Sequence, residues 1–155
     1  MGRPPLERVN KMSLLLLDLD NSVGEPLDGH KFIQRLCAQR IIAKAQEQGA
    51  IAYYESLGWK IVGITKQAGV ASGKKSLQSC IKEQEYTLTL LPALEEIYFC
   101  PEFEGKKCFC VTLNKVHDYN QHRASGTFRK PQPGMLNLAI QRHQPDLALM
   151  VGDRE

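Results

Sequence analysis

The sequence predicts a three-layer α/β/α fold in which a parallel sheet lies between two layers of helices. Short apolar runs alternate with longer segments of helical periodicity, a pattern typical of parallel strands joined by right-handed crossovers. Four runs are expected to be strands: 14–17, 60–65, 96–100 and 147–151. Three segments are expected to be helices: 39–57, 76–91 and 134–143. Polar residues follow the runs, as they do where an open sheet binds a ligand beyond the carboxyl ends of its strands.

The first run, residues 14–17, consists of four leucines. It is far too short to span a membrane and is typical of a strand buried on both faces. Asp18 and Asp20 follow it at alternate positions, so their side chains start on the same side of the strand. Two neighbouring carboxylates repel each other unless a cation lies between them, and oxygen ligands favour Mg²⁺. The alternative is that both aspartates simply belong to the turn that ends the strand.

Length and composition fit one globular domain. The chain has 155 residues, of which 43% are hydrophobic and 24% are charged, and its net charge is +3. Residues 1–12 are expected to be a disordered extension, and residues 13–155 are expected to form the domain. We expect a cytoplasmic protein without a membrane partner, because the sequence contains neither a secretion signal nor a transmembrane run. The weak positive charge neither requires nor excludes a nucleic-acid partner.

Polar residues near the other strand ends add to the aspartate pair. Thr65 ends the second strand and precedes a glycine-rich loop, which suits an anion, although a tight strand-to-helix turn would have the same composition. Lys130 precedes the last helix, and Asp153 follows the last strand. At one edge of a parallel sheet, these residues would form a set suited to phosphoryl groups.

Three of the five cysteines, Cys100, Cys108 and Cys110, lie within eleven residues. Without a secretion signal, crowded cysteines indicate a metal site before a disulfide. Together with Glu102 they could bind a tetrahedral Zn²⁺ ion. The alternative is a hydrophobic loop that contains free cysteines.

Four motifs, taken in order, span most of the chain. The first is Asp18-Leu19-Asp20 followed by Asn21-Ser22, and the second is Thr65-Lys66-Gln67 with Gly69 and Gly73. The third runs from Arg129 to Met135, and the fourth is Gly152-Asp153-Arg154. Their order and spacing resemble those of haloacid dehalogenase-like (HAD) phosphatases of subclass IIIA, which includes histidinol-phosphate and heptose-bisphosphate phosphatases. The third motif matches the family pattern without change, whereas Asn21, Ser22 and Lys66 depart from it.

The resemblance implies a role for each motif residue. Asp18 would be the nucleophile that forms an aspartyl-phosphate, and Asp20 would be the general acid and then the general base. Thr65 and Lys130 would bind phosphoryl oxygens. Asp153 would hold Mg²⁺ together with Asp18 and the backbone carbonyl of Asp20. The implied fold is the Rossmann-like HAD sheet. Family members continue it past the fourth motif with a helix and a strand that the printed sequence lacks, so one face of the strand at 147–151 is expected to be exposed.

The resemblance extends to the cysteine segment, which is similar to the zinc loop of heptose-bisphosphate phosphatases. A histidine is expected there at the position of Glu102, so we expect this segment to bind Zn²⁺ weakly or not at all.

Three function classes follow. The first is a Mg²⁺-dependent phosphomonoesterase that acts on a small phosphorylated metabolite, such as a sugar phosphate or histidinol phosphate. The second is a polynucleotide 3′-phosphatase that binds a nucleic-acid 3′-phosphate end, because Asp28 to Phe32 and Arg129 to Pro131 also resemble the phosphatase domain of polynucleotide kinases. The third is a truncated, non-catalytic relic, suggested by Asn21, Lys66 and the missing last elements.

Overall fold

The computed structural model describes residues 12–19, 49, 51–122, 125–130 and 132–151. Its strands are β1 (Ser13–Asp18), β2 (Lys60–Lys66), β3 (Leu94–Cys100), β4 (Phe109–Val111), β5 (Val116–Asp118) and β6 (Leu147–Val151). Its helices are α3 (Ala68–Ala71), α4 (Leu77–Leu90) and α5 (Gly134–His143), and residues 51–56 are also helical. Residues 1–11 of the predicted extension and 39–48 of the first predicted helix lie outside the described residues.

The four predicted strands form the parallel part of the sheet. β1 pairs with β2 on one side and with β6 on the other, and β2 pairs with β3. The prediction of a parallel sheet between helices is therefore confirmed. The α/β architecture was expected because each of these strands is an apolar run long enough to stand out in the sequence.

Two short strands that the sequence did not predict continue the sheet beyond β3. β4 is antiparallel to β3, and β5 is antiparallel to β4, which gives the strand order β5-β4-β3-β2-β1-β6. The segment from 101 to 133, in which the sequence predicted neither a strand nor a helix, therefore contains two strands. The rings of Phe99 and Phe109 stack across the new strand pair with their centroids 5.4 Å apart.

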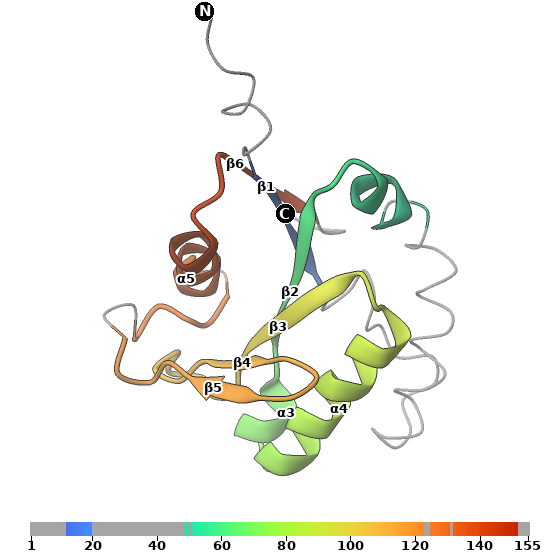
Figure 1. The fold of residues 1–155 in the computed structure, drawn as a ribbon. Helices are drawn as coiled ribbons and strands as arrows, with labels where there is room; N and C mark the ends of the chain where they lie inside the picture. Colours follow the sequence, from blue (N-terminus) through green and yellow to red (C-terminus); the bar gives the residue numbers. More distant parts are fainter. Residues whose placement is uncertain (1–11, 20–48, 50, 123–124, 131, 152–155) are drawn as a thin grey trace, which may run out of the picture.

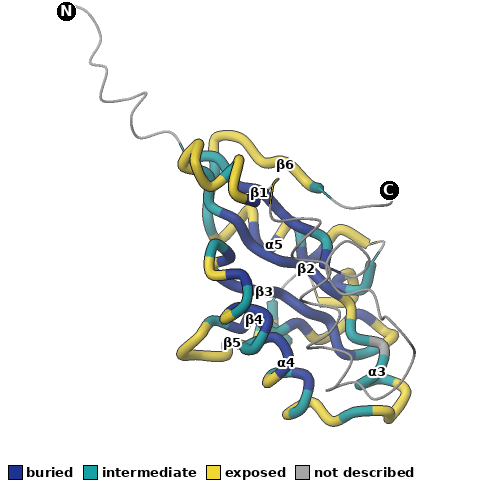
Figure 2. Tube along the Cα trace, turned by 90° about the vertical axis from the view of Figure 1, so that its right-hand side faces the viewer, coloured by how far each residue is buried: buried dark blue, intermediate teal, exposed yellow. Residues whose placement is uncertain are grey.

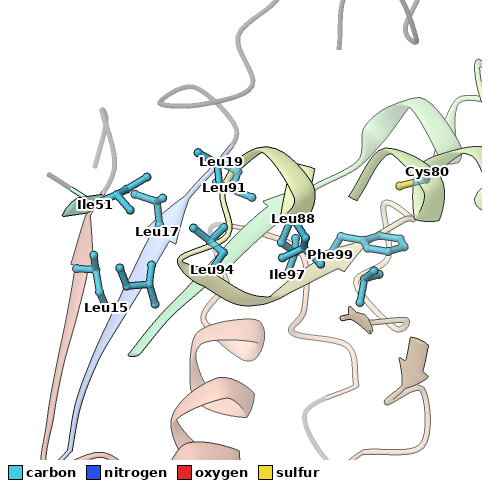
Figure 3. Close-up of a cluster of buried hydrophobic side chains, with 12 residues drawn as sticks. Leu15, Leu17, Leu19, Ile51, Cys80, Leu88, Leu91, Leu94, Ile97 and Phe99 are labelled. Carbon is cyan, nitrogen blue, oxygen red and sulfur yellow. The ribbon is translucent and has the colours of Figure 1, made fainter. Parts of the chain in front are cut away.

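Alternate leucines of β1 enter the two layers beside the sheet. α5 lies on one side of the sheet, and α3 and α4 lie on the other (Figure 1). Leu15 and Leu17 join the apolar cluster that contains residues of α4 (Figure 3), whereas Leu14 and Leu16 join the cluster that contains residues of α5. All four side chains are at most 2% exposed, which confirms the prediction that this strand is buried on both faces.

β6 lies at the edge of the described sheet, and Figure 2 draws most of it as exposed. Leu147 and Leu149 on one face are 55% and 39% exposed, and Met150 on the other face is 39% exposed, so exposure is not confined to the single face expected for this strand. The part of the chain that the structure describes contains no helix with the length and apolar character that a membrane span requires.

Candidate active site

Asp18 lies at the carboxyl end of β1, where the backbone of the following residue is fixed to β2. The amide of Leu19 donates a hydrogen bond to the carbonyl of Ile64 at 3.0 Å, so the parallel ladder continues past Asp18. The Leu19 side chain packs over Gly63, where an added Cβ would lie 2.6 Å from Leu19 Cδ1. Glycine at position 63 therefore lets Leu19 close over β2, which fixes the backbone next to the Asp18 carboxylate.

Lys130 reaches Asp18 from the loop before α5. Its Nζ donates hydrogen bonds to Asp18 Oδ1 at 2.8 Å and to the Ile64 carbonyl at 3.2 Å. The side chains of Lys130 and Asp18 are 18% and 16% exposed. The ion pair is therefore largely removed from water but still open on one side, and such a position strengthens the attraction between the two charges.

Gly134 allows the loop that carries Lys130 to approach the start of α5. Its amide donates to the Thr127 carbonyl at 2.8 Å, and an added Cβ would lie 2.5 Å from Thr127 Oγ1. The neighbouring Phe128 is fully buried, and its amide donates to the carbonyl of Gly105 at 3.0 Å. The backbone on the N-terminal side of Lys130 is thus fixed both to α5 and to the segment after β3.

Thr65 is the penultimate residue of β2 and is buried, with 3% of its surface exposed. Its Oγ1 donates to the carbonyl of Lys66 at 3.2 Å and accepts a hydrogen bond from Gln67 Nε2 at 3.0 Å. The amide of Gln67 donates to the Cys100 carbonyl at 3.0 Å, which ties this turn to the end of β3. Gln67 matched a motif position without receiving a role from the sequence. Its spacing of two residues from Thr65 is the signal that would have suggested this contact.

The predicted Mg²⁺ ligands are only partly described. Asp20 and Asp153 lie outside the described residues, so Asp18 is the described member of the set. Its carboxylate provides the oxygen donors that Mg²⁺ prefers, at the strand end where open α/β sheets bind ligands. The donor chemistry at Asp18 therefore fits the ion.

The predicted zinc ligands do not form a ligand set. Cys100, Cys108 and Cys110 are fully buried among the residues beside α5, and burial raises the pKa of each thiol. The Cys100 thiol donates to the Glu102 carbonyl at 3.3 Å, while Glu102 Oε1 accepts from the amide of Lys106 at 2.9 Å. Among the described residues, no three His, Cys, Asp or Glu side chains are grouped in a way that could hold a metal.

A buried polar cluster joins β3 to the last turn of α5; we call it the arginine cluster (Glu96, Tyr98, Arg142 and His143). Glu96 Oε2 accepts hydrogen bonds from Arg142 Nη1 at 2.9 Å and from the Tyr98 hydroxyl, and it lies 2.6 Å from His143 Nε2. Burial alone would raise the pKa of Glu96. The hydrogen bonds from His143 and Tyr98 and the charge of Arg142 outweigh that effect and lower the pKa to about 2.

Comparisons with known proteins identify relatives of one kind. No family model matches the chain. The chain is 30% identical over 112 residues to D-glycero-beta-D-manno-heptose-1,7-bisphosphate 7-phosphatase of Pasteurella multocida, a match that covers 68% of this chain and 54% of the relative. It is 26% identical over 107 residues to D-glycero-alpha-D-manno-heptose-1,7-bisphosphate 7-phosphatase of Burkholderia mallei, which covers 65% of this chain and 51% of the relative. The chain thus spans about half the length of the curated relatives it matches.

A solved structure shows the same fold. The D,D-heptose 1,7-bisphosphate phosphatase of B. bronchiseptica, complexed with magnesium and phosphate, matches with a TM-score of 0.50 and 21% sequence identity. The match covers 91% of this chain and 69% of that chain. Sequence and fold together confirm the resemblance inferred from the four motifs: this chain resembles the haloacid dehalogenase-like phosphatases, and the heptose-bisphosphate phosphatases among them.

Proposed function

We propose that this chain is a Mg²⁺-dependent phosphomonoesterase that acts on a small phosphorylated sugar. The observation that supports it best is the contact between Lys130 and Asp18, 2.8 Å apart at the carboxyl end of a buried parallel strand. The relatives named as heptose-bisphosphate phosphatases support a sugar phosphate over a nucleic-acid end.

Asp18 is the proposed nucleophile. One of its carboxylate oxygens attacks phosphorus while the bond from phosphorus to the leaving oxygen breaks, and Asp20 donates a proton to that oxygen. Asp20 then takes a proton from water, whose oxygen attacks the aspartyl-phosphate and releases inorganic phosphate and free Asp18. The two steps return both carboxyl groups to their starting states.

Lys130 and the end of β2 stabilise negative charge in these steps. The ammonium of Lys130 offsets the charges of Asp18 and of the phosphoryl oxygens, because it lies against the carboxylate before the reaction begins. Its second bond, to the Ile64 carbonyl, keeps it there when the phosphoryl group moves. The Thr65 hydroxyl, held by Gln67, offers a hydrogen bond to a phosphoryl oxygen.

Mg²⁺, when bound, supplies further positive charge to the phosphoryl group. Asp18, the carbonyl of Asp20 and Asp153 would hold it.

Phosphate release by the purified chain tests the proposal. The substrates are a heptose 1,7-bisphosphate, histidinol phosphate and a 3′-phosphorylated oligonucleotide, each with and without Mg²⁺. We expect Mg²⁺-dependent release from the sugar phosphate. Phosphate release from none of the three would overturn the proposal in favour of a non-catalytic relic, and release from the oligonucleotide alone would replace it with a polynucleotide 3′-phosphatase.

Two variants test the named residues. Asp18→Asn should abolish turnover because an amide does not attack phosphorus, and Lys130→Ala should lower it strongly. Lys115→Ala is the control for loss of one positive charge, because Lys115 lies in the turn between β4 and β5. Val111, the last residue of β4, pairs with Ile97 in the middle of β3, so this turn extends away from the carboxyl end of β3 and from the site. Full turnover by Asp18→Asn would show that another residue is the nucleophile.

A further inference from the structure

We propose that the thiol segment of this chain, residues 100–110, is held in place without a metal. In the family that this chain resembles, Zn²⁺ would hold this segment in place. Here the arginine cluster holds it instead. This inference concerns stability and is independent of the proposed phosphatase activity.

The groups that would bind zinc are already engaged with their own segment. The Glu102 carboxylate, the candidate fourth ligand, caps the amide of Lys106, and the Cys100 thiol donates to the Glu102 carbonyl. The backbone of Cys108 is held on both sides, by Asn120 Oδ1 at 3.1 Å from its amide and by the amide of Tyr119 at 2.8 Å from its carbonyl. These hydrogen bonds fix the backbone of the segment by protein groups alone.

A fixed positive charge lies against one of the thiols. Arg142 Nη1 lies 3.8 Å from Cys110 Sγ. The same nitrogen donates to Glu96 and to the Tyr98 hydroxyl, so its position is set by the arginine cluster. The Cys110 sulfur therefore already has a polar partner outside the thiol segment, and this partner is held in place by β3.

The arginine cluster contacts β3 and β4, the two strands that a metal would join, and connects them to α5. Glu96 and Tyr98 belong to β3, Arg142 and His143 belong to α5, and the contact with Cys110 adds β4. The Arg142 guanidinium lies over the rings of Tyr98 and Tyr119, 5.8 and 5.5 Å from their centroids. The Glu96 and His143 side chains are 7% and 10% exposed, whereas Arg142 is 31% exposed, so the carboxylate is buried and the guanidinium reaches it from the edge of the cluster.

Zinc content and thermal melting of the whole chain test the inference. Protein purified without chelator should contain no stoichiometric zinc by elemental analysis, and EDTA should leave its Tm unchanged. Arg142→Gln should lower the Tm equally with and without added zinc, because it leaves the Glu96 carboxylate buried with fewer partners. One zinc per chain whose removal lowers the Tm would overturn the inference, as would an unchanged Tm in Arg142→Gln.

A matched thiol separates packing from metal binding. Cys80 is as fully buried as Cys108 but belongs to α4 and lies in the other apolar cluster. If the thiols only fill space, Cys108→Ala and Cys80→Ala should lower the Tm by similar amounts. A much larger loss in Cys108→Ala, accompanied by loss of bound zinc, would contradict the proposal. Should Arg142→Gln fail to fold, the zinc content of the parent protein and the two cysteine variants still decide between these outcomes.

Discussion

Replacing Gly134 by alanine should separate Lys130 from Asp18 without touching either residue. Gly134 is the first residue of α5, and its Cα faces the backbone of Thr127, three residues before Lys130. An added Cβ would lie 2.6 Å from the Thr127 carbonyl carbon and 2.5 Å from its Oγ1, and closer still to the carbonyl oxygen. Backbone atoms cannot rotate away as a flexible side chain can, so the loop or the helix must move.

The distances give the size of the effect. Ordinary van der Waals contact begins near 3.4 Å, so the Thr127 carbonyl carbon must retreat by about 0.8 Å. If that shift reaches Lys130, the 2.8 Å contact with Asp18 opens to about 3.6 Å, beyond hydrogen-bond range. A misplacement of about 1 Å can cost on the order of 10²-fold in rate. Forcing a group into a packed interior costs about 1–3 kcal/mol of stability.

Turnover and melting of two glycine variants test this reasoning. Gly49→Ala is the control, because no atom of the described residues lies within 4 Å of its added Cβ. Since alanine favours a helix over glycine, this variant should melt at the parent's temperature or slightly above it. Gly134→Ala should melt lower and lose most of its kcat. If Gly134→Ala keeps the parent's kcat and Tm, the close approach of Thr127 does not position Lys130.

Two further predictions concern titratable groups. The pKa of Glu96 is lowered from 4.5 to about 2 in the folded chain. The ionised carboxylate therefore contributes up to about 3 kcal/mol to the free energy of unfolding above pH 4.5, and this contribution is lost as the pH falls toward 2. The difference in free energy of unfolding between the parent and Glu96→Gln, measured by urea denaturation, should therefore become smaller below pH 4.5. A difference that does not change with pH would refute this. Asp20→Asn should lose about 10²–10⁴-fold in rate on an alkyl phosphate but less on an aryl phosphate, whose leaving group needs no proton; equal losses on both substrates would argue against Asp20 as the acid.

The long strands could be predicted from the sequence, whereas the short ones could not. Residues 14–17 and 60–65 are apolar runs that fill both layers, so burial alone identifies them. β4 and β5 contain three residues each, too few for alternation to show, and β5 is exposed throughout. Their pairing depends on the turn between Thr112 and Lys115, where the Thr112 amide donates to the Lys115 carbonyl at 2.8 Å.

The sequence predicted which residues lie at the site, but not the backbone contacts that hold them in position. Asp18 could be placed at the sheet edge because parallel strands bring their carboxyl ends together, whereas Lys130 was placed there by the third family motif. The carbonyl of Ile64 and the close approach at Gly134 carry no signal in the sequence, because both depend on backbone positions set by distant segments. The arginine cluster was missed for the same reason, since Glu96 and Arg142 are 46 residues apart.

α5 connects these supports, because it is fixed at both ends. At its N-terminus, Gly134 holds the Thr127 carbonyl and with it the loop of Lys130. At its C-terminus, Arg142 and His143 bind Glu96, a position where positive charge also suits the helix dipole. The two ends are about 12 Å apart along the helix axis. Met135, Leu138 and Ala139 are buried between them, so we expect loss of the Glu96 contacts to loosen the C-terminal turn of α5 and to leave Lys130 at Asp18.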